Sequence, residues 1–379
     1  MTYPEDWEVK KLGECCIILD NKRKPVSGSV RVAGKYPYYG ANGILDYVSS
    51  YIFDGVYVLV GEDGSVITPN GNPVVTWAEG KIWVNNHAHV VQEKEGTSLR
   101  YLFYALQTIN ISELIHGNIP KFTGRDLRNL QIPIPPLPEQ QAIADTLTVF
   151  DTHITNLANL IAKKKAIRDG ALDDLMSART RLKGFSGQWE VKKLGELGVV
   201  KMCRRIFQEQ TRPVGQIPFY KIGTFGGEAD AYITRELYEK YKSLYPYPKI
   251  GDVLLSAAGT IGRAVIFDGK DSYFQDSNIV WLDVNHDVIC NKFLYYFYRS
   301  CHWHNIEGTT INRLYNSIIL DTPINLPPLP EQQAIADTLT AFDDEINALE
   351  SERAKIIQIR DGAMNDLLTG KVRLLHHGK

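Results

Sequence analysis

The chain has 379 residues, of which 44% are hydrophobic and 23% charged, a globular composition that fits two or three domains and excludes a disordered or fibrous chain. Its formal net charge of −2 excludes an overall polycation, so any nucleic-acid binding must come from local clusters of Lys and Arg. We find neither a secretory signal nor the roughly 20 consecutive apolar residues of a membrane span, and expect a cytoplasmic protein.

Residues 1–136 are expected to form a strand-rich domain. Residues 55–61 are an apolar run of strand length between two glycines, and residues 81–84 are similar. Turn signals follow at 69–73, and apolar side chains at helical spacing predict a short helix over 98–109. We expect an α+β domain with a twisted, partly barrel-like sheet.

Residues 137–180 are predicted to form a long helix. Prolines precede it, and a proline is tolerated in the first turn of a helix but not in its interior. A helix of about 40 residues would be roughly 60 Å long, which is too long to bury its apolar seam against one small domain. An ordinary amphipathic helix packed on the first domain is the alternative. The seam, with its alternating spacing of a coiled coil, comprises Ile143, Leu147, Phe150, Ile154, Leu157 and Ile161.

The second half of the chain repeats this order. Residues 7–14 (WEVKKLGE) recur at 189–196, and residues 135–148 (PPLPEQQAIADTLT) recur unchanged at 327–340. We therefore divide the chain into residues 1–136, 137–180, 181–327 and 328–379.

The second long helix carries a matching seam. We expect the two helices to bury their seams on each other as an antiparallel coiled coil with pseudo-twofold symmetry, and the C-terminus to return near the N-terminus. The second seam comprises Ile335, Leu339, Phe342, Ile346 and Leu349.

The interiors of the two strand-rich domains, about 15–116 and 197–307, show little register with each other. A preserved frame with divergent contents is expected of two readers of different targets. Gene duplication followed by drift is the alternative.

A Pro-Pro-Leu-Pro-Glu-Gln block that opens a long helix, and occurs twice, resembles the specificity subunit of type I restriction–modification enzymes. The resemblance covers essentially the whole chain. Residues 38–43 (YYGANG) and 259–263 (GTIGR) are further family-like elements, and residues 117–121 and 308–313 resemble equivalent loops before each long helix. In that family the strand-rich domains are target recognition domains and the long helices are conserved spacers.

The resemblance implies a DNA-recognition subunit that has no catalytic site and binds no metal or cofactor. Each target recognition domain would read one half-site of a split, asymmetric target. Two methyltransferase subunits would use S-adenosylmethionine to methylate adenine N6, and motor-nuclease subunits would use ATP and Mg to cut unmodified DNA. A coiled-coil interaction scaffold without DNA specificity is the alternative.

Candidate DNA contacts follow from residue type and from position on loops. Arg, Lys, Asn, Gln, Ser and Thr read base edges, and Lys and Arg bind phosphates. For any single candidate, a solvated charge or a turn cap is the competing interpretation. The candidates are Lys22, Arg23, Lys24, Tyr39, Asn42, Asn85, Asn86, His87 and Lys121 in the first domain, and Lys201, Arg204, Arg205, Lys221, Thr224, Arg263, Ser277, Asn278 and Arg313 in the second.

The sequence also lacks patterns that indicate catalysis. It contains no Walker A motif, no Asp/Asn-Pro-Pro-aromatic block of an adenine methyltransferase, and no CxxC pair among its five cysteines. Cys301 and His304 lie at an expected helix end, but two such side chains do not make up a zinc site, and we interpret both as structural.

Overall fold

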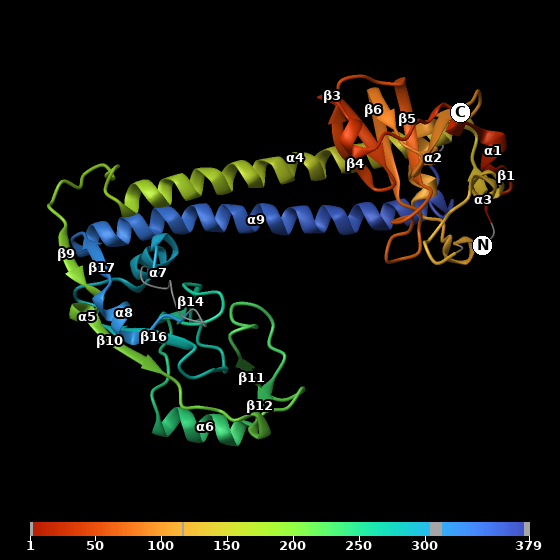
Figure 1. Ribbon diagram of the computed structural model, residues 1–379. Helices are drawn as coiled ribbons and strands as arrows, with labels where there is room; N and C mark the ends of the chain where they lie inside the picture. Colours follow the sequence, from red (N-terminus) through yellow and green to blue (C-terminus); the bar gives the residue numbers. More distant parts are fainter. Residues whose placement is uncertain (1–2, 116, 304–312, 375–379) are drawn as a thin grey trace, which may run out of the picture. The chain divides into compact units, whose positions relative to one another are not determined.

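The computed structural model describes residues 3–115, 117–303 and 313–374 (Figure 1). Within these residues the chain combines β-sheets with helices, including two long ones, and this is the predicted α+β fold class. No helix of the described part is both long and apolar enough to cross a membrane.

Two compact units divide the chain. Unit 1 is Met1–Asn159 with Ser351–Lys379, and unit 2 is Leu160–Glu350. Each unit holds a sheet-based domain and one part of each long helix, α4 (Leu137–Met176) and α9 (Leu329–Leu368). Because the units cut through both helices, they do not correspond to the four predicted segments, whose boundaries stay a prediction.

A six-stranded sheet forms the centre of unit 1, in the order β2-β7-β5-β6-β3-β4. Strand β5 is apolar because both of its faces are covered. Val58 and Val60 point into one core, and Tyr57 and Leu59 point into a second core on the opposite face. The second core is built almost entirely from strands of this same sheet, so the sheet curves around it as a partly closed barrel. The strands are β2 (Cys16–Ile18), β3 (Ala33–Gly40), β4 (Gly43–Val48), β5 (Phe53–Gly61), β6 (Val75–Val84) and β7 (Ala88–Glu93).

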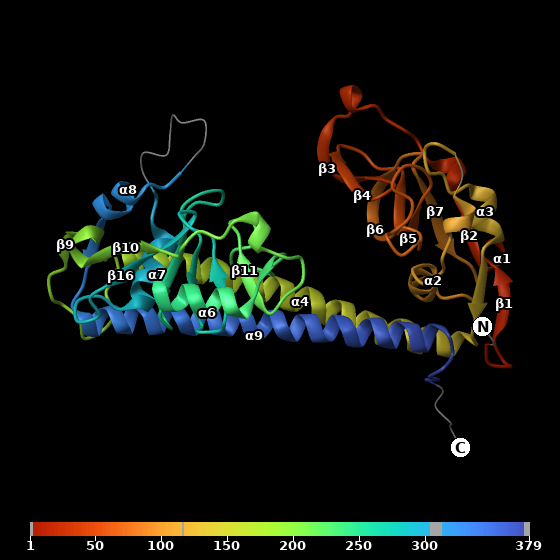
Figure 2. The ribbon, with the colours of Figure 1, turned by 90° about the horizontal axis from the view of Figure 1, so that it is seen from below.

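Short elements connect this sheet to the long helices. Strand β1 (Glu8–Lys11) pairs with β8 (Gln131–Ile134), which leads into α4. Helix α2 (Leu99–Leu106) lies between the sheet and α4 (Figure 2). It falls within the predicted helical region and is capped by Ser98, whose hydroxyl accepts a hydrogen bond from Tyr101 N. The remaining turns are α1 (Leu12–Cys15), η1 (Asp20–Lys22), η2 (Gly28–Val30), η3 (Ser112–Leu114) and α3 (Gly124–Asn129).

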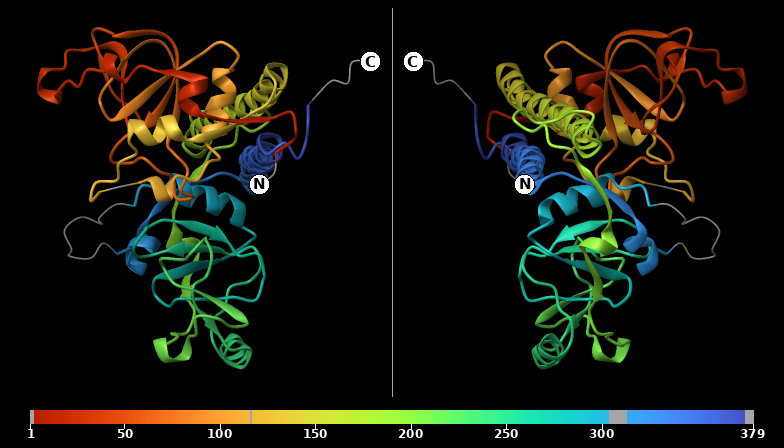
Figure 3. Two further views of the ribbon diagram at one scale, coloured as in Figure 1. Left: turned by 90° about the vertical axis from the view of Figure 1, so that its right-hand side faces the viewer. Right: turned by 90° about the vertical axis from the view of Figure 1, so that its left-hand side faces the viewer.

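Unit 2 contains a four-stranded sheet, β10-β16-β13-β14, and a three-stranded sheet, β12-β11-β15. The four-stranded sheet matches the β2-β7-β5-β6 part of unit 1, with antiparallel pairing throughout. Helix α7 (Asn291–Ser300) lies next to the long helices and α6 (Arg235–Leu244) on the opposite side of the unit (Figure 3). Helix α6 was not predicted from the sequence. The other elements are β9 (Glu190–Lys193), β10 (Gly198–Met202), β11 (Ile217–Tyr220), β12 (Tyr232–Ile233), β13 (Val253–Ser256), β14 (Ala264–Ile266), β15 (Tyr273–Phe274), β16 (Ile279–Val284), β17 (Pro323–Leu326), η4 (Gln208–Gln210), α5 (Leu194–Leu197) and α8 (Asn316–Asp321).

The long helices run antiparallel in each unit. In unit 1, Leu147 near the start of α4 shares a core with Leu367 near the end of α9. In unit 2, Leu175 near the end of α4 shares a core with Leu339 near the start of α9. Both cores also include the sheet domain, so each domain buries one end of the seam. Leu157 and Ile161 are buried outside both cores, as expected of a seam that is too long for one domain. Of the seam residues, Ile143, Leu147, Leu157, Ile161, Ile335, Leu339 and Ile346 are buried, and Phe150, Ile154, Phe342 and Leu349 are half-buried.

The same contacts recur within each unit, with α4 and α9 exchanging roles. In unit 1, Tyr104 Oη donates a hydrogen bond to Asp151 of α4 at 2.8 Å. In unit 2, Tyr296 Oη donates to Asp343 of α9 at 2.9 Å. The internal sequence repeat is therefore also a repeat of side-chain contacts.

A buried glutamate in the first turn of each long helix also makes the same contacts in both units. In unit 1, Glu139 accepts hydrogen bonds from Trp7 Nε1 at 3.0 Å and Arg373 Nε at 2.6 Å. Arg373 also donates to Asp6 at 2.7 Å, so residues near the two ends of the chain are in contact. The matching residues in unit 2 are Glu331, Trp189 and Arg181.

Candidate nucleic-acid interface

Hydrogen bonds bring the candidate loops of unit 1 together. Lys24 N donates to the carbonyl oxygen of Val84 at 3.3 Å, and Glu62 N donates to that of His87 at 2.8 Å. Phe122 N donates in turn to the carbonyl oxygen of Glu62 at 2.8 Å. We call the joined segments the unit 1 loop cluster, which comprises residues 20–24, 61–64, 84–88 and 117–122.

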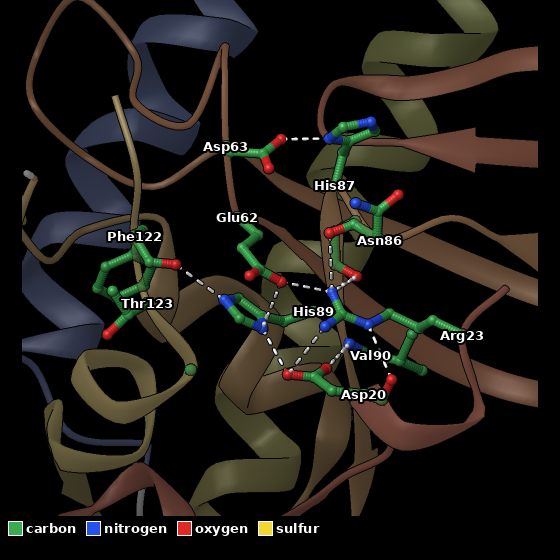
Figure 4. A network of polar contacts seen from close by, with 12 residues as sticks. Asp20, Arg23, Glu62, Asp63, Asn86, His87, His89, Val90, Phe122 and Thr123 are labelled. Atoms are coloured by element: carbon green, nitrogen blue, oxygen red, sulfur yellow. Dashed lines mark hydrogen bonds and ion pairs between the residues drawn. The ribbon is translucent and has the colours of Figure 1, made fainter. Parts of the chain in front are cut away.

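Arg23 lies inside this cluster (Figure 4). Its side chain is 12% exposed, and Nη1 donates to Glu62 Oε2 at 2.6 Å and to the carbonyl oxygen of Ala88 at 2.8 Å. Asp20 lies 3.6 Å from the guanidinium. The structure therefore corrects the assignment of Arg23 as a DNA contact, because its donors hold the loops to one another.

His89 is buried beside Arg23 and is fully hydrogen-bonded. Its Nδ1 lies 2.7 Å from Asp20 Oδ2 and its Nε2 lies 2.9 Å from the carbonyl oxygen of Phe122. Because a carboxylate and a carbonyl both accept, only the doubly protonated ring, an imidazolium, can donate to both. Burial raises the pKa of the Asp20 carboxyl, but the hydrogen bond and charge of His89 and the charge of Arg23 outweigh it, and the net pKa lies below its ordinary value.

Asp20, Glu62 and His89 also form the one group of potential metal ligands found among the described residues, with their ligand atoms within 4.8 Å of one another. Arg23 and the protonated ring already supply two positive charges to the two carboxylates. Both nitrogens of His89 are engaged, and neither offers a lone pair. We therefore interpret the group as an ion-pair network.

Two further candidates of the first domain are buried. Tyr39 packs in the second core of the sheet, and burial raises the pKa of its hydroxyl. Asn85 is also buried, and its Oδ1 accepts a hydrogen bond from His87 N at 2.8 Å. Their assignment as DNA contacts is corrected: Tyr39 is part of the core, and Asn85 caps the turn that presents Asn86 and His87.

The remaining unit 1 candidates are exposed. On the loop cluster, His87 Nδ1 faces Asp63, and Lys121 Nζ lies 3.4 Å from Glu62 Oε1. Asn42 instead lines a separate surface cavity of about 600 Å³, together with Asn70 and other polar side chains that the sequence analysis interpreted only as a turn. The exposed candidates are Lys22, Lys24, Asn42, Asn86, His87 and Lys121.

Unit 2 has its own loop cluster. Arg313 Nη2 donates to the carbonyl oxygen of Ser277 at 2.9 Å, and Arg263 Nη1 donates to that of Phe225 at 2.6 Å. Leu314 N donates to the carbonyl oxygen of Ala257 at 2.8 Å. These bonds join residues 222–227, 257–263 and 275–278 to Arg313, the part of the second predicted loop (308–313) that lies within the described residues.

The other unit 2 candidates differ in their exposure to solvent and in the side chains that they contact. Arg204 and Arg205 are exposed and lie over the rings of Tyr245 and Phe207, each at 5.3 Å. Lys201 lies within strand β10, outside the loop cluster, and pairs with Asp283. Thr224 and Asn278 lie on the cluster, where Thr224 accepts a hydrogen bond from Lys221 N and Asn278 is half-buried. Lys221 directly precedes the cluster and pairs with Asp230.

A cavity of about 520 Å³ in unit 2 exposes polar residues that the sequence analysis missed. Gln275 lines it with Oε1 fixed by a hydrogen bond from Ile222 N at 2.9 Å, which also fixes the direction of its amide donor. Gln208 and Arg212 line the same cavity. The signal was present, because Gln and Arg are base-reading residues and both lie on loops.

The family model of the type I restriction modification DNA specificity domain matches residues 4–165 and 186–359. The chain belongs to the type I restriction enzyme specificity subunit family. A type I restriction enzyme specificity subunit of Haemophilus influenzae is 45% identical over 352 residues, which cover 90% of this chain and 89% of the relative. The MjaVIII specificity subunit of Methanocaldococcus jannaschii is 24% identical over 99% of this chain and 95% of its own length. These matches confirm the family that the repeated block indicated.

Solved structures show the specificity-subunit fold. The crystal structure of the type I restriction–modification S subunit from M. genitalium has a TM-score of 0.67 and 18% identity, covering 97% of this chain and 98% of that one. A second chain, from a study of complex assembly and conformational transition of the type I system, has a TM-score of 0.56 and 16% identity over 98% of this chain and 100% of its own.

Proposed function

We propose that this specificity subunit reads a split, asymmetric DNA target, with one sheet domain at each half-site, and directs adenine-N6 methylation or cleavage by partner subunits. The observation that carries the proposal is that one frame holds two different loop clusters. The frame consists of the repeated contacts of the long helices, such as Tyr104 with Asp151 and Tyr296 with Asp343.

The loops of the two units differ in the groups that they bury and in the side chains that they expose. Unit 1 buries charged groups beneath Lys24, His87 and Lys121. Unit 2 presents Arg204 and Arg205 on a loop that follows strand β10. Two surfaces that differ in this way favour two different base sequences, so the target is expected to lack palindromic symmetry.

The partners are inferred from the family. Two methyltransferase subunits would bind S-adenosylmethionine and modify one adenine in each half-site, and motor-nuclease subunits would use ATP and Mg to cut unmodified DNA. This chain would supply DNA specificity and no catalytic group. Its exposed lysines and arginines would release counterions from DNA, so affinity should fall steeply as salt rises.

The test is to co-express the chain with its methyltransferase partner and to map methylated adenines across the host genome by long-read sequencing. We expect one split motif with different half-sites and one modified adenine in each. The same methyltransferase expressed alone is the control and should leave the motif unmodified. A stable, cofactor-binding complex that modifies no motif would contradict the proposal, as would a palindromic motif.

A further inference from the structure

We infer that His89, held as an imidazolium inside the unit 1 loop cluster, is a positioning residue for recognition of the half-site that unit 1 reads. The inference rests on the proposed function and adds that the two half-sites depend on different chemistry. It is carried by the contacts of the ring, by its burial, and by the apolar residues at the matching positions of unit 2.

The ring joins three segments that are far apart in the sequence (Figure 4). Nδ1 bonds Asp20 on the segment after β2, and Nε2 bonds the carbonyl oxygen of Phe122 on the segment before α3. Glu62, on the segment after β5, lies 3.6 Å from Nδ1. Removing the ring would therefore release all three segments from a shared centre.

Asp20 is ionised, as its lowered pKa indicates, so only the imidazolium serves both contacts. A neutral imidazole has one N–H, so either Asp20 or the carbonyl of Phe122 would lose its donor. Water cannot easily replace it, because the side chain of His89 is 1% exposed. An unpaired polar group at such a buried place is costly, and the loops would be expected to move apart to hydrate it.

The network is electrically balanced. Asp20 and Glu62 are the carboxylates that face the ring, and Arg23 is the second cation among them. Lys121 approaches Glu62 from outside at 3.4 Å, and Arg128 of α3 lies beyond, donating a hydrogen bond to the carbonyl oxygen of Gly124. Without the charge of His89, Arg23 would be left as the buried cation that faces both carboxylates.

The buried network around His89 also holds the exposed loops in position. Gly64 N donates to the carbonyl oxygen of Pro120 at 3.0 Å, and Asp63 and Lys121 form an isolated β-bridge. The exposed Asn86 precedes His89 by three residues, and its carbonyl oxygen accepts from Arg23. The exposed side chains of the cluster are therefore displayed on segments that the buried network holds in place.

Unit 2 lacks the acid at the position of Glu62. In unit 1, Phe122 N donates to the carbonyl oxygen of Glu62; in unit 2, Leu314 N donates to that of Ala257, with the same distance of 2.8 Å. Ala257 is therefore the counterpart of Glu62.

Unit 2 also lacks the histidine. Val60 pairs with His89 across the β5–β7 ladder, and Leu255 pairs with Val280 across the matching β13–β16 ladder. Each of these strand residues lies two positions before Glu62 or Ala257, so Val280 is the counterpart of His89. The same alignment of β2 with β10 places Met202 where unit 1 has Asp20.

The experiment uses the complex of this chain with its methyltransferase. It measures binding to the full DNA target and compares it with binding to targets in which one or the other half-site is scrambled. His89→Val, which introduces the unit 2 residue, should lower discrimination against scrambling of one half-site by at least about tenfold and leave the other unchanged. The affected half-site should be the one that also depends on Lys24.

A conservative substitution separates positioning from a general loss of stability. His89→Gln can still donate one hydrogen bond, so discrimination at the same half-site should fall between wild type and His89→Val, while the other half-site should stay unchanged.

Tyr104→Phe is the matched control, because it removes a partly buried hydrogen bond from unit 1 away from the loop cluster. It should leave both half-sites unchanged. Equal losses at both half-sites, no loss in a folded His89→Val complex, or a His89→Gln complex that discriminates no better than His89→Val would overturn the inference. A wild-type complex that reads no split target would instead refute the proposed function.

Discussion

Truncation of Leu147 to alanine tests the burial of the helix seam in the domain cores. Leu147 is fully buried and shares its core with α2 and with the end of α9. A Leu→Ala change in such a core costs about 3 kcal/mol, through the transfer free energy of the removed atoms and the cavity left behind. For a unit of this size the melting temperature should fall by roughly 6 to 12 °C.

The measurement is calorimetric unfolding of the full chain, with hydrogen exchange to locate the loss. Leu339→Ala, at the matching position of the repeat, should produce a similar loss in unit 2. Ile154→Ala is the contrast, because Ile154 is half-buried and outside both cores, and should cost about 1 kcal/mol. If Leu147→Ala were no more costly than Ile154→Ala, or if both leucine variants weakened the same unit, our account of the cores would be wrong.

Further predictions concern DNA binding, the long helix and the thiols. Replacing Arg204 and Arg205 with alanine should weaken recognition of one half-site only and reduce the salt dependence of log affinity by about 1 for each phosphate that is no longer neutralised, measured by titration at several salt concentrations. Insertions or deletions within residues 155–165 should change the gap between half-sites or abolish activity without changing either half-site, as a methylation map would show. Burial raises the pKa of the Cys16 thiol to about 12, so at pH 8 it should be alkylated much more slowly than the half-buried Cys290, as peptide mass spectrometry would show.

The long helices and their antiparallel pairing could be predicted because they depend on local and repeated signals. Proline fixes where each helix begins, and the alternating apolar spacing marks the face that is buried. Helix α6 was missed because most of its residues are charged or polar and it follows a turn-rich segment, although Thr234 caps it by accepting a hydrogen bond from Leu237 N. Such a cap is visible in the sequence only once a helix is expected there.

The individual site residues could not be predicted with the same success. Arg23 and Lys24 are neighbours of the same chemical type, yet Arg23 is held by Glu62 while Lys24 is exposed. The difference arises because distant loops supply the acceptors, and no local pattern records that. Gln275 could not be singled out for the same reason, since the cavity that it lines is formed by segments remote in sequence.

The ion pair between Arg373 and Asp6 has a consequence for how the protein is made. Unit 2 is one continuous stretch of chain, whereas unit 1 combines the first segment with the last. During synthesis the first domain leaves the ribosome before unit 2 but lacks Met364 and Leu367, which complete its core, until those two residues have been added. Unit 2 can therefore reach its final packing before unit 1, and a nascent chain stalled before Ser351 would carry one finished unit and one with an open core.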